Sequence, residues 1–146
     1  MLFDSNVWLA LTFPTHPHHA LVKKVFGRAS IESPACFCRA TQQSFLRLAT
    51  TPVLLHAYGA LGFTNQDAVK LIKTLSSLAT VSTLEEPSGL EPRWLELAGL
   101  PSSSPKVWMD AYLAAFSIRH GVEFVTLDRD FQNFEKDGLN LRLLTS

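Results

Sequence analysis

Residues 104–128 read SPKVWMDAYLAAFSIRHGVEFVTLD, a helix pattern followed directly by a strand pattern. The Ser-Pro pair at 104–105 suits the N-cap and first position of a helix, and Gly121 suits its end. The apolar run 122–127 then predicts a buried strand, which ends at Asp128. A strand without a polar face is typical of a parallel sheet that helices cover on both sides.

The alternation of short apolar strands with helices extends along the chain. Further strands are expected at 2–3, 34–38, 81–84 and 139–144, and further helices at 7–13, 18–28, 39–49, 64–78 and 91–98. Residues 52–62 are poorly periodic and carry no clear helix or strand pattern. Strands separated by helices predict an α/β fold with a mainly parallel central sheet between helical layers, as one domain over residues 1–146.

The composition is that of a globular protein. The chain has 146 residues, 47% of them apolar and 18% charged, which allows a sizeable core. Thirteen basic and thirteen acidic residues cancel. The net charge therefore gives no support to nucleic-acid binding, although acids gathered at a metal site could mask basic residues around them.

The sequence shows no sign of a membrane or export signal. No apolar stretch approaches the roughly 20 residues that span a bilayer, and Asp4 lies where the apolar part of a signal peptide would be. Cys36 and Cys38 are expected to be reduced, buried thiols. We therefore expect a cytoplasmic protein that does not bind membranes.

Three aspartates stand where the apolar pattern breaks. Asp4 follows the strand at 2–3, Asp128 follows the strand at 122–127, and Asp110 lies near the start of the long helix. The carboxyl ends of parallel strands share one edge of a sheet, and the first turns of the helix that precedes a strand lie at the same edge. The three carboxylates should therefore converge, and their summed charge calls for a hard cation such as Mg²⁺ or Mn²⁺.

Each acid also has a purely structural explanation. Asp4 could cap the helix that follows it, and Asp128 could open a turn. Asp110 lies near a helix N-terminus, where the helix dipole favours a negative charge. Asp130 could be an ordinary surface turn residue. The expected position of Asp4, Asp110 and Asp128 at one edge of the sheet favours a metal site over three separate structural explanations, whereas the turn is the favoured interpretation for Asp130.

Three segments together resemble the signature segments of PIN-domain nucleases, and most closely those of VapC toxins from bacterial toxin–antitoxin systems. The segments are LFDSNV at 2–7, MDAYLAA at 109–115 and VTLDRDF at 125–131, while CRATQQSFLRLAT at 38–50 resembles one VapC subgroup. The resemblance implies a PIN-like three-layer α/β/α sandwich and a Mg²⁺- or Mn²⁺-dependent endoribonuclease. It also implies a cognate VapB-type antitoxin and a homodimer.

The resemblance assigns Asp4, Asp110 and Asp128 as catalytic metal ligands. The ion would orient and deprotonate a water that hydrolyses the RNA phosphodiester bond. Many PIN domains carry a Glu on the helix after the second strand, and Gln42 aligns with that position here. Gln42 could orient a water without adding charge, or Asp130 could supply the missing charge as a further ligand.

Asn6 and Thr126 are candidate supporting residues. Thr126 lies two positions before Asp128 and would point to the same side of a continuing strand. Its hydroxyl could bond a metal-bound water, or the residue could simply favour a strand. Asn6 could bond Asp4 or a metal-bound water, or could cap the helix.

Three basic residues are candidates for contact with the RNA backbone: Arg47, Lys106 and Arg129. Arg47 could instead pair with an acid, and an ordinary exposed position on a helix is the slightly favoured interpretation for this residue. Trp8 and Trp108 flank the acid-bearing segments, and we expect both to pack in the core rather than to stack on RNA.

Two other functions are compatible with the same residues. The first is an RNA-binding or regulatory module with the PIN fold and a catalytically degenerate site. The missing Glu and the zero net charge favour it. A phosphatase that forms a phospho-aspartate at Asp4 is disfavoured, because Asn6 stands where such enzymes need a second Asp.

Overall fold

The computed structural model describes residues 1–145, so the predicted domain 1–146 extends one residue beyond it, to Ser146. The strands are β1 Leu2–Phe3, β2 Ala35–Phe37, β3 Val81–Thr83, β4 Phe124–Thr126 and β5 Leu141–Leu143. The helices are α1 Ser5–Thr12, α2 His19–Phe26, α3 Arg39–Ala49, α4 Pro52–Ala57, α5 Asn65–Ser77, α6 Leu90–Ala98 and α7 Val107–His120, with the 3₁₀ helix η1 Arg129–Asp137.

The five strands form one sheet in the order β3-β2-β1-β4-β5, with every pairing parallel. β1 and β4 are neighbours, and Phe3 pairs with Val125 in their register. The residues that follow, Asp4 and Thr126, are therefore level with each other at the carboxyl edge. The predicted α/β class with a parallel sheet is confirmed.

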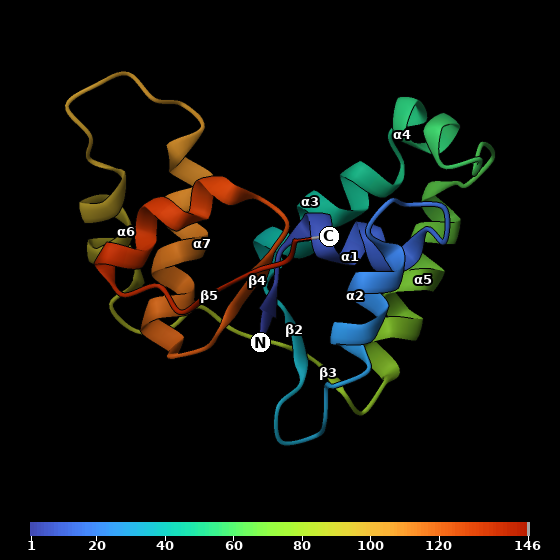
Figure 1. Cartoon of the computed structure of the whole chain (residues 1–146), viewed down its shortest axis with the longest axis horizontal. Helices are drawn as coiled ribbons and strands as arrows, with labels where there is room; N and C mark the ends of the chain where they lie inside the picture. Colours follow the sequence, from blue (N-terminus) through green and yellow to red (C-terminus); the bar gives the residue numbers. More distant parts are fainter. Residues whose placement is uncertain (146) are drawn as a thin grey trace.

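The sheet separates two buried cores because successive strand residues point to opposite faces. Phe3, Phe37 and Val125 pack in the core beneath α1, α2 and α3. Leu2 and Phe124 pack in the core beneath α6 and α7. Figure 1 shows the sheet almost edge-on between these two groups of helices. The three-layer α/β/α arrangement is thus confirmed.

The two tryptophans beside the acid-bearing segments differ in environment. Trp8 is fully buried and stacks on Phe37 with ring centroids 3.8 Å apart, as predicted for a core residue. Trp108 is 52% exposed, so the prediction that it packs in the core was wrong. It lies in the first turn of α7, where the edge of Trp94 is its aromatic neighbour, at 6.3 Å.

Two elements were missed and several boundaries differ by one to three residues, of which the start of α7 bears on the site. The poorly periodic stretch contains α4, whose six residues are too few to show a helical period. Residues 129–137 form the 3₁₀ helix η1, whose tighter winding does not produce the spacing of an α-helix. Helix α7 begins at Val107 rather than just after Ser104, which places Asp110 in its first turn.

The expected state of the cysteines is confirmed, since Cys36 and Cys38 are both free and buried. Across residues 1–145, every helix falls short of the length and apolar character needed to cross a bilayer.

Candidate active site

The three aspartates line a single pocket at the carboxyl edge of the sheet. Asp4 directly follows β1, Asp128 lies two residues after β4, and Asp110 projects from the first turn of α7. All three border a pocket of about 260 Å³, together with Ser44 and other residues of α3. The structure therefore brings Asp4 together with two acids that lie more than one hundred residues further along the chain.

Asp4 is buried and held by hydrogen bonds to both carboxylate oxygens. Its Oδ1 accepts from the Ser5 amide at 2.7 Å, and its Oδ2 accepts from Thr126 Oγ1 at 2.6 Å and Asn6 Nδ2 at 3.1 Å. Burial raises the pKa of Asp4, while the hydrogen bonds from Thr126 and Ser5 oppose that shift. Asp4 also caps α1, as the structural explanation of this residue predicted, and its assignment as a metal ligand stays a prediction.

Thr126 links two of the acids. Its buried hydroxyl donates its proton to Asp4 and accepts from the backbone amide of Asp128 at 3.0 Å. The proton that was expected to bond a metal-bound water is therefore used within the protein. Asn6 completes the connection, because its amide donates to Asp4 and its Oδ1 accepts from the Leu127 amide at 3.2 Å.

Asp110 lies in a region of concentrated negative charge. Its pKa is raised to about 6, chiefly because it is desolvated. The charge of Lys106 opposes this shift, whereas Asp128, Asp4 and Asp130 add to it. A cation in the pocket would relieve this repulsion.

Lys106 is ion-paired rather than free at the edge of the site. Its exposed ammonium contacts Asp130 and lies 3.7 Å from Oδ2 of Asp128. Oδ1 of Asp128 accepts from the Asp130 amide at 2.9 Å. Asp130 does not line the pocket of the three aspartates but borders the larger pocket beside it. The assignment of Asp130 as a further metal ligand stays a prediction.

Gln42 does not face the acid pocket, where the family pattern placed it. Its Oε1 accepts from Arg39 Nη1 at 2.7 Å, and its Nε2 donates to Thr83 Oγ1 at 3.5 Å. The α3 residues that line the pocket include Thr41 and Ser44. One residue along an α-helix turns the side chain by about 100°, so Gln42 points toward β3 instead.

Two serines that the sequence reasoning missed extend the network around Asp4. Ser44 Oγ donates to Ser5 Oγ at 3.2 Å, and Ser5 Oγ donates to Asp4 Oδ1 at 3.3 Å. The polar residues Thr41 and Ser44, three apart on an otherwise apolar helix side, were the signal that could have indicated this face of α3.

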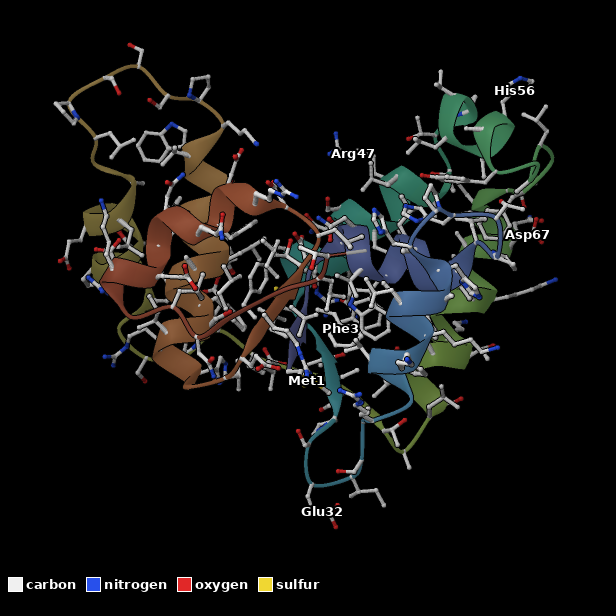
Figure 2. The ribbon with its side chains drawn as sticks, in the orientation of Figure 1. Met1, Phe3, Glu32, Arg47, His56 and Asp67 are labelled. Carbon is white, nitrogen blue, oxygen red and sulfur yellow. The ribbon has the colours of Figure 1, made fainter. Side chains whose placement is uncertain are left out.

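The two predicted arginine contacts lie outside the acid pocket. Arg47 is exposed on α3, and Figure 2 shows it extending outward from that helix. Arg129 is exposed at the start of η1. Both stay predictions as contacts to RNA.

A family model described as "PIN domain" matches residues 1–137. The chain belongs to the PIN domain family. Ribonuclease VapC41 of Mycobacterium tuberculosis is 43% identical over 145 residues, 99% of this chain and 98% of the relative. Ribonuclease VapC31 of the same species is 30% identical over 138 residues, 91% of this chain and 92% of the relative. The predicted resemblance to VapC proteins is confirmed.

A solved structure of VapBC-1 from nontypeable Haemophilus influenzae has the same fold as this PIN domain. The TM-score is 0.63, with 97% of this chain and 96% of that chain covered, and the sequences are 12% identical. The agreement extends over nearly the whole chain, so it supports the α/β/α arrangement of all layers.

The acids of this PIN domain suit a hard divalent cation. Carboxylate oxygens are the ligands that Mg²⁺ and Mn²⁺ prefer, and desolvation together with the charges of Asp128, Asp4 and Asp130 raises the pKa of Asp110. Within residues 1–145, however, no group of three or more His, Cys, Asp or Glu side chains is already arranged to hold a metal ion. Asp4 is held by hydrogen bonds from Ser5, Asn6 and Thr126.

Thr126→Val tests the hydrogen bond that fixes Asp4. The substitution keeps the side-chain shape but leaves buried Asp4 without its shortest donor. We expect the free energy of unfolding at pH 7.5 to fall by about 1–3 kcal/mol. Urea denaturation measures this change.

The matched control is Thr74→Val, which removes an exposed hydroxyl bonded to the Lys70 carbonyl. It should change stability by less than about 0.5 kcal/mol. Equal losses in the two variants would contradict a special contribution from Thr126.

Asp110→Asn tests the repulsion in the metal-free PIN domain. The folded-state pKa of about 6 exceeds the ordinary value of 3.8, so the folded state binds this proton more tightly than the unfolded state. Stability is therefore lost as pH rises from about 4 through 6. We expect Asp110→Asn to be more stable than the parent at pH 7.5, by no more than about 1 kcal/mol because solvent screens a half-buried group.

Thermal unfolding with a chelator at pH 4.5, 6 and 7.5 measures this effect, and the advantage should shrink toward pH 4.5. Glu135→Gln, a neutralised acid at an exposed position of η1, is the control. A gain that is independent of pH would count against the charge of Asp110 as the cause, whether that charge is disfavoured by desolvation or by repulsion.

Proposed function

We propose that this PIN domain is a Mg²⁺- or Mn²⁺-dependent endoribonuclease and the toxin of a VapBC-type module, acting in the cytoplasm as one domain over residues 1–146. The observation that carries the proposal is the pocket that Asp4, Asp110 and Asp128 line together. Relatives named ribonuclease, 43% and 30% identical, support the reaction class.

In this proposal Asp4, Asp110 and Asp128 are the oxygen ligands of the ion. When bound, the ion supplies Lewis acidity at the phosphate and lowers the pKa of a water. Thr126 and Asn6 keep Asp4 ionised and oriented despite its burial, since hydrogen bonds to a carboxylate favour its charged form. Asp110 and Asp128 reach the pocket from two other segments and complete the donor set.

Lys106, Arg47 and Arg129 are the proposed contacts to the RNA backbone. Lys106 has the most direct role, because its ammonium already lies beside Asp128 at the site. Exposed ion pairs contribute little to stability, so the ammonium can exchange its carboxylate partners for a phosphate at little cost. The acids of the pocket also explain how a chain of zero net charge can hold basic contact residues.

Asp110→Asn is the central test of the nuclease proposal. We expect at least about a hundredfold loss of RNA cleavage, since a metal ion contributes several kcal/mol to stabilising the transition state. Cleavage of a fluorescent single-stranded RNA with Mg²⁺ or Mn²⁺ measures the rate, and a chelator should abolish it. Glu135→Gln should cleave like the parent.

Unchanged cleavage by folded Asp110→Asn would sink this proposal. The alternative is a catalytically degenerate module that binds RNA or regulates, and the position of Gln42 away from the site favours it. Calorimetric titration with Mn²⁺ separates the two. The nuclease should show saturable binding that Asp4→Asn removes, whereas the degenerate module should show none.

A VapB-type antitoxin and a homodimer complete the proposal. The name VapBC-1 of the structural neighbour supports the antitoxin. Apolar side chains exposed on and near α4 and α5, such as Val53, Leu61 and Val69, support a protein interface. Light scattering of the purified chain should give twice the monomer mass at micromolar concentration. A monomer mass would remove the homodimer from the proposal.

A further inference from the structure

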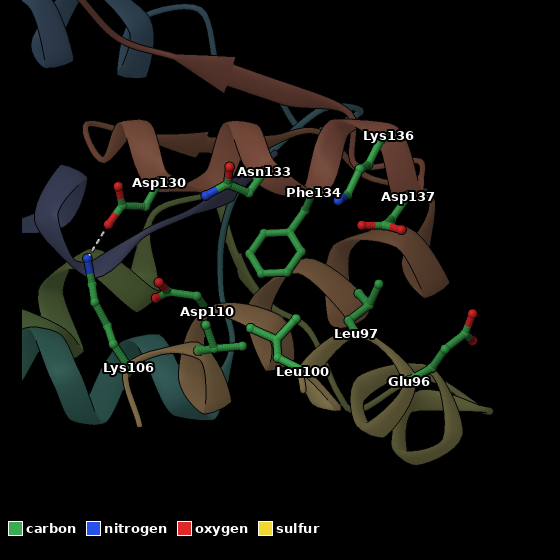
Figure 3. A pocket seen from close by; sticks show the side chains of 11 residues that line it. Glu96, Leu97, Leu100, Lys106, Asp110, Asp130, Asn133, Phe134, Lys136 and Asp137 are labelled. Atoms are coloured by element: carbon green, nitrogen blue, oxygen red, sulfur yellow. Dashed lines mark hydrogen bonds and ion pairs between the residues drawn. The ribbon is translucent and has the colours of Figure 1, made fainter. Parts of the chain in front are cut away.

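A larger pocket adjoins the acid pocket, between helices α6, α7 and η1. Its volume is about 560 Å³, within the range of small-molecule sites. Asp110 borders both pockets, so the larger one begins where the proposed reaction centre ends. Figure 3 shows the two helices and η1 surrounding it, with the Lys106–Asp130 ion pair at the end near Asp110.

The wall of this pocket contains three apolar side chains, of which two are buried and one is exposed. Leu97 and Phe134 are each 8% exposed, whereas Leu100 is 46% exposed at the rim. Figure 3 shows the Phe134 ring directed into the space from η1. Phe134 is 8% exposed, and its ring lies 6.1 Å from that of Phe131, which lies 4.6 Å from Phe124 in the sheet. Phe134 is therefore a firmly held apolar contact that borders the pocket.

Polar groups on the same wall have no protein partners. Asn133, Lys136 and Asp137 border the pocket. Within residues 1–145, their side chains make no hydrogen bond and no ion pair, whereas Lys106 pairs with Asp130 nearby. The Asp137 backbone is nevertheless held in place, because its carbonyl accepts from Arg93. An amide, an ammonium and a carboxylate are thus left free above an apolar floor.

The charge of the pocket excludes a phosphate group as its ligand. Four carboxylates border the pocket, those of Glu96, Asp110, Asp130 and Asp137, against the two ammonium groups of Lys106 and Lys136. A dianionic or monoanionic group would be repelled. A neutral, flat group with N–H donors would satisfy both the apolar floor and the excess of acceptors.

We propose that this pocket is the subsite for one unstacked guanine base of the RNA, next to the cleaved phosphate. The proposal rests on the proposed nuclease function. Proteins bind single-stranded RNA by stacking splayed-out bases on aromatic rings and bonding their edges. Guanine alone offers two adjacent donors, N1–H and the N2 amino group, which match both oxygens of the Asp137 carboxylate. Asn133 and Lys136 supply donors for its O6 and N7 acceptors.

Nucleoside binding tests the pocket without nuclease activity. Guanosine, adenosine, cytidine and uridine are titrated separately into the metal-free protein, and amide shifts are followed by NMR. We expect guanosine to shift the Asn133 side-chain amide and the backbone of η1, and the other three to shift them much less. Asp137→Asn should remove the guanosine response, and Glu135→Gln, on η1 but outside the pocket, should keep it.

Cleavage of a random-sequence RNA tests the same residues in the working enzyme. Sequencing of the cut ends should show a guanine preference at one position beside the cut. A good bidentate contact discriminates by about 1–3 kcal/mol, so Asp137→Asn should reduce the preference by roughly 5- to 150-fold. Asn133→Ala should also weaken the preference, and it serves as the test if Asp137→Asn fails to fold.

The outcomes separate this inference from the proposed function. Cleavage without a guanine preference, or with one that both pocket variants retain, overturns the subsite while the nuclease stands. If the parent cleaves no RNA, the nucleoside titration decides, and a guanosine response still supports the pocket. Binding of N-acetylarginine amide without any guanosine response would assign the pocket to a protein side chain and overturn the proposal.

Discussion

The hydrogen bond from Thr126 to Asp4, 2.6 Å long and buried, joins the ends of the two neighbouring strands on which the candidate site is built. The parallel register places these two residues level with each other, directly beyond Phe3 and Val125. An acid in this position is costly unless its charge is solvated by donors. Thr126 supplies one donor and thereby also fixes the backbone of Asp128.

The other two acids depend on this arrangement in different ways. Asp128 is positioned through Thr126 and by its own bond to the Asp130 amide. Asp110 reaches the site from α7, which packs on the sheet through the core beneath α6 and α7, on the face opposite to α1. The site therefore combines a buried carboxylate, Asp4, held by three neighbouring residues, with Asp128, held by the Asp130 amide, and Asp110, which reaches the pocket from the first turn of α7.

Much of the fold followed from the sequence because its signals were local and mutually consistent. The strand 122–127 and the helix before it fixed the parallel sheet, and the acids at strand ends followed from the shared edge. Short elements such as α4 and η1 were missed because a few residues cannot display a period. Trp108 was placed wrongly because an apolar side chain in the first turn of a helix can extend past the layer that would cover it.

The site was predicted less evenly than the fold. The convergence of Asp4, Asp110 and Asp128 could be predicted from topology alone. The direction of the Gln42 side chain could not, because successive residues of an α-helix point about 100° apart and an alignment that is wrong by one residue selects the wrong face of α3. The bonds of Ser44 and Ser5 and the Lys106 ion pair join segments far apart in sequence. No local pattern records such contacts, so they became visible only in three dimensions.

The double role of Asp4 has a consequence for how the chain can lose its proposed activity. Asp4 both lines the pocket and caps α1, whereas Asp110 lines the pocket and its ionised form is disfavoured by desolvation and by neighbouring acids. We therefore expect replacement of Asp4 to cost stability as well as the proposed activity, and replacement of Asp110 to leave the fold intact. Under selection against the activity, folded but inactive variants should therefore arise first through substitutions at Asp110. Substitutions at Asp4 should be found mainly in variants that are unstable and present at low levels.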